Sequence, residues 1–208
     1  MRDERQTRIL LVPGLGGSGA GHWQMIWAGA RSRARIVQQT SWDEPTVVGW
    51  VDGIDAAIDA ADTPVVLVAH SLGCVAVAHW AERVPDSRRV VGALLVAPCD
   101  VERGDACAAI TRFAPAPAAA LPFRSTVVAS RDDPYVEFGR AQCFATRWGS
   151  AFVDAGAIGH INAASRLGDW SFGQVLLDDV LAAARDHRHV RVATLRSDLS
   201  PAPPCFGP

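Results

Sequence analysis

A serine at the end of an apolar run is the strongest chemical signal in this sequence. Ser71 lies in Val65–Gly73 (VVLVAHSLG), and the residues that follow, CVAVAHWAERV, have the composition of a helix. A strand, a tight turn and a helix in this order form a nucleophile elbow, with the serine at its apex. The turn requires small residues two positions before and after the serine, here Ala69 and Gly73. Glycine is more usual than alanine at the first position, and such a string also occurs by chance, but the flanking strand and helix favour the elbow.

A glycine-rich turn follows the first apolar run of the chain. Val12–Ser18 reads VPGLGGS, at the place where enzymes with such an elbow carry a loop that helps to bind the oxyanion of the reaction intermediate. The backbone N–H groups predicted to bind the oxyanion are those of Leu72, directly after the serine, and of Leu15 in the loop. The glycine spacing matches neither the P-loop nor the dinucleotide-binding motif. A turn that only reverses the chain is the alternative.

An acidic segment and a histidine follow the serine in the chain order that an elbow requires. His160 lies in a glycine-rich loop after a short apolar run and is predicted to be the general base. Ser130–Val136 (SRDDPYV) follows another apolar run, and its proline biases Asp133 towards extended geometry. From these residues alone, either Asp132 or Asp133 could be the acid of a Ser-His-Asp triad. A helix N-cap is the alternative role for Asp133, and a solvated loop charge for Asp132.

Strands and helices are predicted to alternate along the chain. The strand-like runs are apolar throughout, which is typical of strands buried on both faces. Their alternation with segments of helical period predicts an α/β fold with a doubly wound, mostly parallel sheet, whose functional residues lie at the carboxyl ends of the strands. The predicted strands are Arg8–Val12, Arg35–Gln38, Val65–Ala69, Val90–Ala97, Ser125–Ala129 and Ala151–Asp154, and the predicted helices are Gly21–Ala30, Pro45–Ala61, Leu72–Val84, Pro134–Trp148 and Asp169–Arg185.

The length of 208 residues suits a single domain, predicted to comprise residues 1–185. Thr111–Pro122, rich in alanine and proline, is predicted to be an irregular crossover within that domain. Residues 186–208 are rich in arginine and histidine and then in proline, so we expect a loosely packed C-terminal extension.

The composition excludes several classes of function. A formal net charge of −2 provides no basic surface for nucleic acid or for an anionic membrane. The start of the chain lacks a signal-peptide pattern, and no apolar run is long enough to cross a bilayer. The five cysteines form neither a metal-ligand pair nor a disulfide framework, which favours a cytoplasmic protein. No metal ion or organic cofactor is expected, and the oligomeric state is not indicated.

Together these motifs resemble those of the small α/β-hydrolase-fold serine hydrolases, the family typified by the bacterial YdeN-type proteins and the human retinoblastoma-binding protein 9. The resemblance spans roughly Ile9 to Arg185. In that family the acid precedes the proline, which implies that Asp133 is the acid. The resemblance also implies a compact fold without a large lid domain. The residues that carry it are Pro13-Gly14, Gly21-His22-Trp23, His70-Ser71-Leu72-Gly73, Ser130–Val136 and Gly159-His160-Ile161-Asn162.

The predicted function is therefore hydrolysis of small carboxylic esters, or of amides or thioesters, through an acyl-enzyme on Ser71. The predicted partner is a small-molecule acyl substrate. His22, Trp23 and Trp42 are candidates for the lining of the substrate pocket, although packing in the core is the favoured role for most of the tryptophans. A binding or scaffold protein on the same fold is the main alternative function. A C–C hydrolase or a haloperoxidase-like enzyme would use the same triad.

Overall fold

The computed structural model describes residues 7–84 and 88–190, and its centre is one six-stranded sheet. The strand order is β2-β1-β3-β4-β5-β6, and every neighbouring pair is parallel. The chain first adds β2 to one side of β1 and then continues on the other side from β3, which confirms the predicted doubly wound α/β sheet. The strands are β1 (Arg8–Val12), β2 (Ala34–Ile36), β3 (Val65–His70), β4 (Val90–Val96), β5 (Ser125–Ala129) and β6 (Ala151–Asp154).

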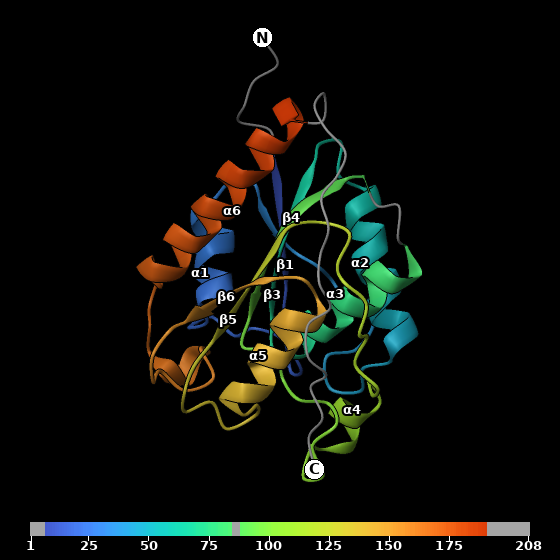
Figure 1. Cartoon of the computed structure of the whole chain (residues 1–208), viewed down its shortest axis with the longest axis vertical. Coiled ribbons are helices and arrows are strands. Elements are labelled where there is room, and N and C mark those ends of the chain that lie inside the picture. The colour runs from blue at the N-terminus through green and yellow to red at the C-terminus, as the bar shows by residue number, and fades with distance from the viewer. Residues whose placement is uncertain (1–6, 85–87, 191–208) are drawn as a thin grey trace.

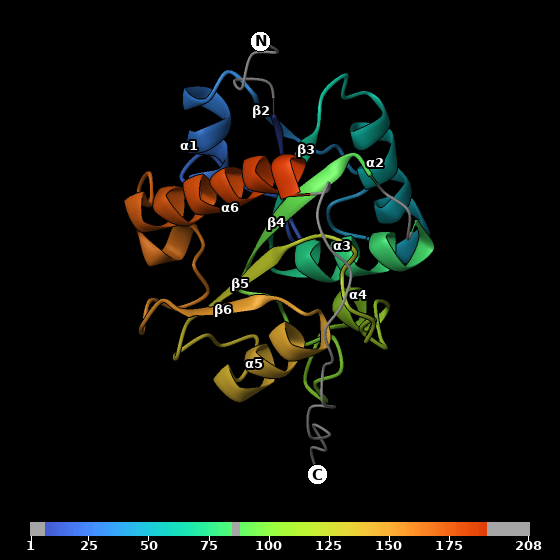
Figure 2. The same ribbon diagram turned by 45° about the horizontal axis from the view of Figure 1, so that its top comes forward.

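Helices cover both faces of the sheet (Figure 1). Figure 2 shows α1 and α6 together on one face, and α2, α3 and α5 on the other. The short helix α4 lies in the connection between β4 and β5. The helices are α1 (Trp23–Ala30), α2 (Val47–Asp59), α3 (Leu72–Arg83), α4 (Ala108–Thr111), α5 (Phe138–Arg147) and α6 (Ser171–Val190), with a 3-10 turn at Ala163–Ser165.

The alternation of side chains along each strand divides the core into two layers. In β1, Leu10 and Val12 pack on the layer with α2, α3 and α5, whereas Ile9 and Leu11 pack on the layer with α1 and α6. All six residues of β3 are buried, because this strand lies in the interior of the sheet. Full burial of one such aliphatic side chain contributes about 1.5–3 kcal/mol. The apolar runs of the inner strands are thus buried on both faces, whereas the edge strands β2 and β6, which the sequence also predicted as buried on both faces, are partly exposed.

Two helix boundaries differ substantially from the prediction. α5 begins at Phe138 instead of Pro134, because the intervening residues form a turn: the carbonyl of Tyr135 accepts a hydrogen bond from the N–H of Asp100 (3.1 Å). α6 continues to Val190, five residues past the predicted end, and residues 191–208 of the predicted extension lie outside the described residues.

No helix within residues 7–84 and 88–190 is long and apolar enough to cross a membrane.

Candidate active site

Ser71 occupies a strained turn between β3 and α3. Its backbone angles are φ 54° and ψ −125°, a region that residues with a side chain seldom adopt. The turn brings α3 close to the glycine-rich loop that follows β1. A Cβ at Gly73 would lie 2.5 Å from the carbonyl oxygen of Val12. A Cβ at Gly14 would lie 2.8 Å from the Cβ of Ser71. Only glycine fits at these two positions, and the two glycines bring the glycine-rich loop against the serine.

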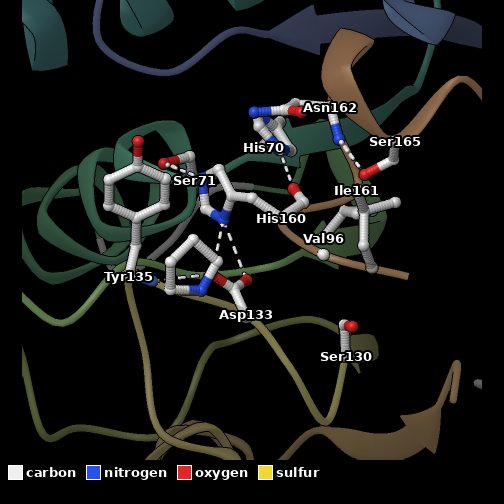
Figure 3. A network of polar contacts seen from close by, with 12 residues as sticks. His70, Ser71, Val96, Ser130, Asp133, Tyr135, His160, Ile161, Asn162 and Ser165 are labelled. Atoms are coloured by element: carbon white, nitrogen blue, oxygen red, sulfur yellow. Dashed lines mark hydrogen bonds and ion pairs between the residues drawn. The ribbon is translucent and has the colours of Figure 1, made fainter. Parts of the chain in front are cut away.

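Ser71, His160 and Asp133 form one continuous chain of hydrogen bonds (Figure 3). The Nε2 atom of His160 lies 2.8 Å from the Ser71 hydroxyl, and its Nδ1 atom lies 2.8 and 2.9 Å from the two carboxylate oxygens of Asp133. All three residues are buried, and the side chain of Asp133 is 0% exposed. Asp133 also accepts a hydrogen bond from the N–H of Tyr135 (2.9 Å), so its carboxylate is fixed from two sides.

Asp132 lies outside this chain of hydrogen bonds and supports the loop that carries His160. Its Oδ1 atom accepts hydrogen bonds from the Ser130 hydroxyl and from the N–H of Gly159, both at 2.7 Å. The Ser130 hydroxyl and the Gly159 N–H hold the pKa of the Asp132 carboxyl below its usual value. Of the two adjacent aspartates, only Asp133 contacts the histidine.

Two further histidines lie beside His160. The ring centroids of His70 and His160 are 4.8 Å apart, as are those of His22 and His70. The Nε2 atom of His70 hydrogen-bonds with the backbone carbonyl of His160 (2.9 Å), which tethers the loop of the predicted base. His22 is the N-cap of α1, and its Nδ1 atom accepts a hydrogen bond from the N–H of Gln24 (3.2 Å).

His22 and His70 are uncharged at neutral pH. Burial, together with the neighbouring His160, lowers the pKa of His22 to about 4. Burial also lowers the pKa of His70 well below its usual value, with smaller contributions from His160 and His22. Since both rings carry no charge, His160 can become an imidazolium without like charge next to it.

We expect the free energy of unfolding to decrease as the pH falls from about 7 towards 4. In the unfolded chain a histidine titrates near pH ~6.5, so below this pH the unfolded state binds protons that folded His22 and His70 do not bind. Each group can contribute a slope of up to about 1.4 kcal/mol per pH unit. Urea unfolding at several pH values measures this slope. His22→Asn, which can still cap α1, should reduce the slope of the free energy of unfolding against pH. An unchanged slope would contradict the conclusion that folded His22 stays uncharged in this pH range.

Gln24 connects the glycine-rich loop to the sheet. It is fully buried, and its side-chain N–H₂ donates to the carbonyls of Val12 (3.3 Å) and Val68 (3.1 Å). Its Oε1 atom accepts a hydrogen bond from the Ser18 hydroxyl (2.7 Å). Both ends of the loop that begins after β1 are therefore held by one side chain of α1.

Gln24→Met should reduce the turnover of the predicted hydrolytic reaction by about tenfold or more, because it releases both ends of the loop while nearly conserving side-chain volume. Loss of these buried hydrogen bonds should also cost about 1–3 kcal/mol of stability. Ser18→Ala is the matched control, since it removes only the hydrogen bond at the end of the loop. Turnover and thermal unfolding measured for both variants test this role, and equal turnover in Gln24→Met and the wild type would refute it.

A cavity of about 280 Å³ opens beside Ser71 and His160. His22, one of the three candidate pocket residues, lines it. Leu15, whose N–H is predicted to bind the oxyanion, also lines it, and Leu72, the other predicted donor, is the first residue of α3, where an N–H has no acceptor within the helix. His70 and Tyr135 also line it, and the Tyr135 ring centroid lies 4.5 Å from that of His160.

Trp23 and Trp42, the other two candidates for the pocket, are not among the residues that line this cavity. Trp23 is 1% exposed and packs with Trp27, one turn later on the same face of α1, while its indole N–H donates to the carbonyl of Ile161 (2.7 Å). Trp42 lies behind the glycine-rich loop, where its ring faces Gly17. Both tryptophans support the walls of the site from outside.

Among the site residues that were not predicted as such from the sequence are His70, Tyr135 and Gln24. The alternation of side chains along β3 indicates the position of His70. Val66 and Val68 pack on the layer with α1, and every second residue of a strand points to the same face, so His70 points to that face too. No spacing rule indicates Gln24, whose partners are distant in the chain. Within the described part of the chain, no three His, Cys, Asp or Glu side chains are grouped so that they could hold a metal ion.

The chain is similar in sequence and in structure to known hydrolases. The family described as serine hydrolase matches residues 9–179. A YdeN-like hydrolase from Pectobacterium atrosepticum is 30% identical, with a TM-score of 0.78 over 86% of this chain and 93% of the other. The ydeN gene product of B. subtilis is 18% identical (TM-score 0.69, 85% and 99% covered), and a monoacylglycerol lipase from Paleococcus ferrophilus is 13% identical (TM-score 0.62, 86% and 95% covered). No curated protein matches the chain.

Proposed function

The chain belongs to the serine hydrolase family, and on this basis we propose that it cleaves small carboxylic esters through an acyl-enzyme on Ser71. The observation that carries the proposal is the unbroken chain of hydrogen bonds from Ser71 through His160 to Asp133. A hydroxyl held 2.8 Å from an imidazole nitrogen, with a buried carboxylate on the other nitrogen, is the arrangement that activates a serine.

The first half of the reaction acylates the serine. His160 accepts the proton of the Ser71 hydroxyl as the oxygen attacks the ester carbonyl, and Asp133 holds the ring in the tautomer that leaves Nε2 free to accept. The backbone N–H groups of Leu15 and Leu72 bind the oxyanion, and one such donor is typically worth about 3 kcal/mol. The protonated His160 then donates its proton to the leaving alcohol.

The second half releases the acid. A water molecule takes the place of the alcohol, His160 removes its proton, and the resulting oxygen attacks the acyl carbonyl. Collapse of this second intermediate returns the proton to Ser71 and frees the carboxylic acid. The neutral state of His22 and His70 supports both halves, because the imidazolium forms twice.

Rapid-mixing kinetics with p-nitrophenyl acetate test this proposal. An acyl-enzyme mechanism predicts a burst of p-nitrophenol, equivalent to up to one product per protein chain, when deacylation is the slower step, followed by steady turnover. A binding or scaffold protein on this fold would give neither phase. Absence of both the burst and the turnover, in a sample that unfolds cooperatively, would overturn the proposal.

A further inference from the structure

A second cavity lies next to the one at the triad. Its volume is about 230 Å³, and Ile110 and Tyr135 line both cavities. Cys99 lines only the second cavity, and its neighbour Ser71, whose side chain partly offsets the rise in the pKa of the Cys99 thiol, lines the first. The second cavity therefore adjoins the part of the first cavity that contains Ser71.

Each of the three charged residues that line the second cavity is held in an ion pair. Arg103 is paired with Asp105 through two hydrogen bonds (2.6 and 2.7 Å), and Asp100 is paired with Arg140 at 3.3 Å. Burial raises the pKa of the Cys99 thiol to about 12, so the thiol is also neutral. A charged ligand would find no unpaired countercharge here and would lose its hydration.

Apart from the two cysteines, the remaining lining is apolar. Ala106, Ile110, Pro134 and the ring of Tyr135 contribute carbon surface to the second cavity. Concave sites with such walls bind uncharged apolar groups, because the gain comes from removing carbon surface from water.

The position of His160 distinguishes the two cavities chemically. In acylation the protonated histidine donates its proton to the oxygen of the leaving alcohol, so the alcohol must lie on the histidine's side of the serine. Of the described residues, His160 lines the first cavity and is not among those that line the second. The alcohol therefore belongs in the first cavity, and the second is left for the acyl chain.

We propose that the second cavity is the acyl-binding site, and that the preferred substrates carry an uncharged, apolar acyl chain of several carbons. This inference rests on the ester hydrolysis proposed above. Each methylene that enters the cavity should raise kcat/KM roughly fourfold, the factor that corresponds to burial of one CH₂ group.

The test compares p-nitrophenyl acetate, butanoate and hexanoate as substrates. In the wild type, kcat/KM should rise along the series. Ala106→Trp fills the second cavity with an indole and should reduce the ratio of kcat/KM for hexanoate to that for acetate at least tenfold. Cys107→Trp is a second variant with the same expected effect, because Cys107 lines the same cavity and is exposed, so that a larger side chain is tolerated.

Ala163→Trp is the matched control, because Ala163 is exposed and lines the first cavity only. This variant should change the ratio of kcat/KM for butyl butanoate to that for methyl butanoate, which is the alcohol ratio. Its ratio of kcat/KM for p-nitrophenyl hexanoate to that for the acetate, which is the acyl-chain ratio, should equal the wild-type value. The inference is overturned if Ala106→Trp and Cys107→Trp both retain the wild-type acyl-chain ratio, or if they change the alcohol ratio instead. A wild type that hydrolyses none of these esters would contradict the proposed function itself, whereas unchanged ratios in active variants would contradict only the acyl-site assignment.

Discussion

Ser71→Ala should abolish the hydrolysis of p-nitrophenyl acetate, with a loss of turnover of about a millionfold. The reason is that the hydroxyl 2.8 Å from His160 is the only group of that residue that can attack the ester. The melting temperature should remain nearly unchanged, because alanine preserves the small side chain in the turn between β3 and α3. Steady-state kinetics and thermal unfolding of the same sample measure both effects.

Ser71→Gly is a sharper control for the same position. It also removes the nucleophile, but it relieves a backbone conformation at φ 54° that costs about 1–3 kcal/mol for a residue with a side chain. We therefore expect Ser71→Gly to be as inactive as Ser71→Ala and at least as stable. Retention of a tenth of wild-type turnover in either variant would show that another residue is the nucleophile.

Asp133→Asn should reduce turnover about ten-thousandfold. An amide can donate to Nδ1 of His160, which leaves the proton on Nε2, so the ring cannot accept the proton of Ser71. The hydrogen bond from the N–H of Tyr135 can still be made to the amide oxygen, so the fold should be retained. The loss should appear in kcat for every ester tested.

Asp132→Asn is the adjacent control and should lower turnover by less than about tenfold. Asparagine keeps the Oδ1 oxygen that accepts from Ser130 and Gly159, so the loop before His160 stays in place. If Asp132→Asn proved the more damaging of the two, the assignment of the acid would be wrong by one position.

The fold was predictable because the strands at the centre of the sheet are buried on both faces. A run such as VVLVAH has no polar face, and only a strand with helices on both sides accommodates it. The bounds of α5 were not predictable from composition, since its first expected turn, from Pro134 onwards, is held instead by the backbone contact between Asp100 and Tyr135. These two residues are far apart in sequence, and no local pattern reports their contact.

The site was predictable where it depends on chain order and uncertain where it depends on contacts. Ser71 and His160 follow from an elbow and from the loop after the last strand. The residues alone left Asp132 and Asp133 open, because both follow the same strand, and only the resemblance distinguished them. The tether from His70 to the carbonyl of His160 joins positions 90 residues apart. Such contacts are set by the packing of the whole sheet and have no local sequence signature.

Mapping the adduct of a fluorophosphonate inhibitor identifies the nucleophile, because this reagent captures an activated serine irreversibly. The protein is labelled, digested and analysed by mass spectrometry, with Asp133→Asn as the comparison sample. We expect one phosphonyl group per chain, located on Ser71, and much slower labelling of the variant. An adduct on any other residue, or no adduct in a preparation that hydrolyses esters, would contradict this expectation.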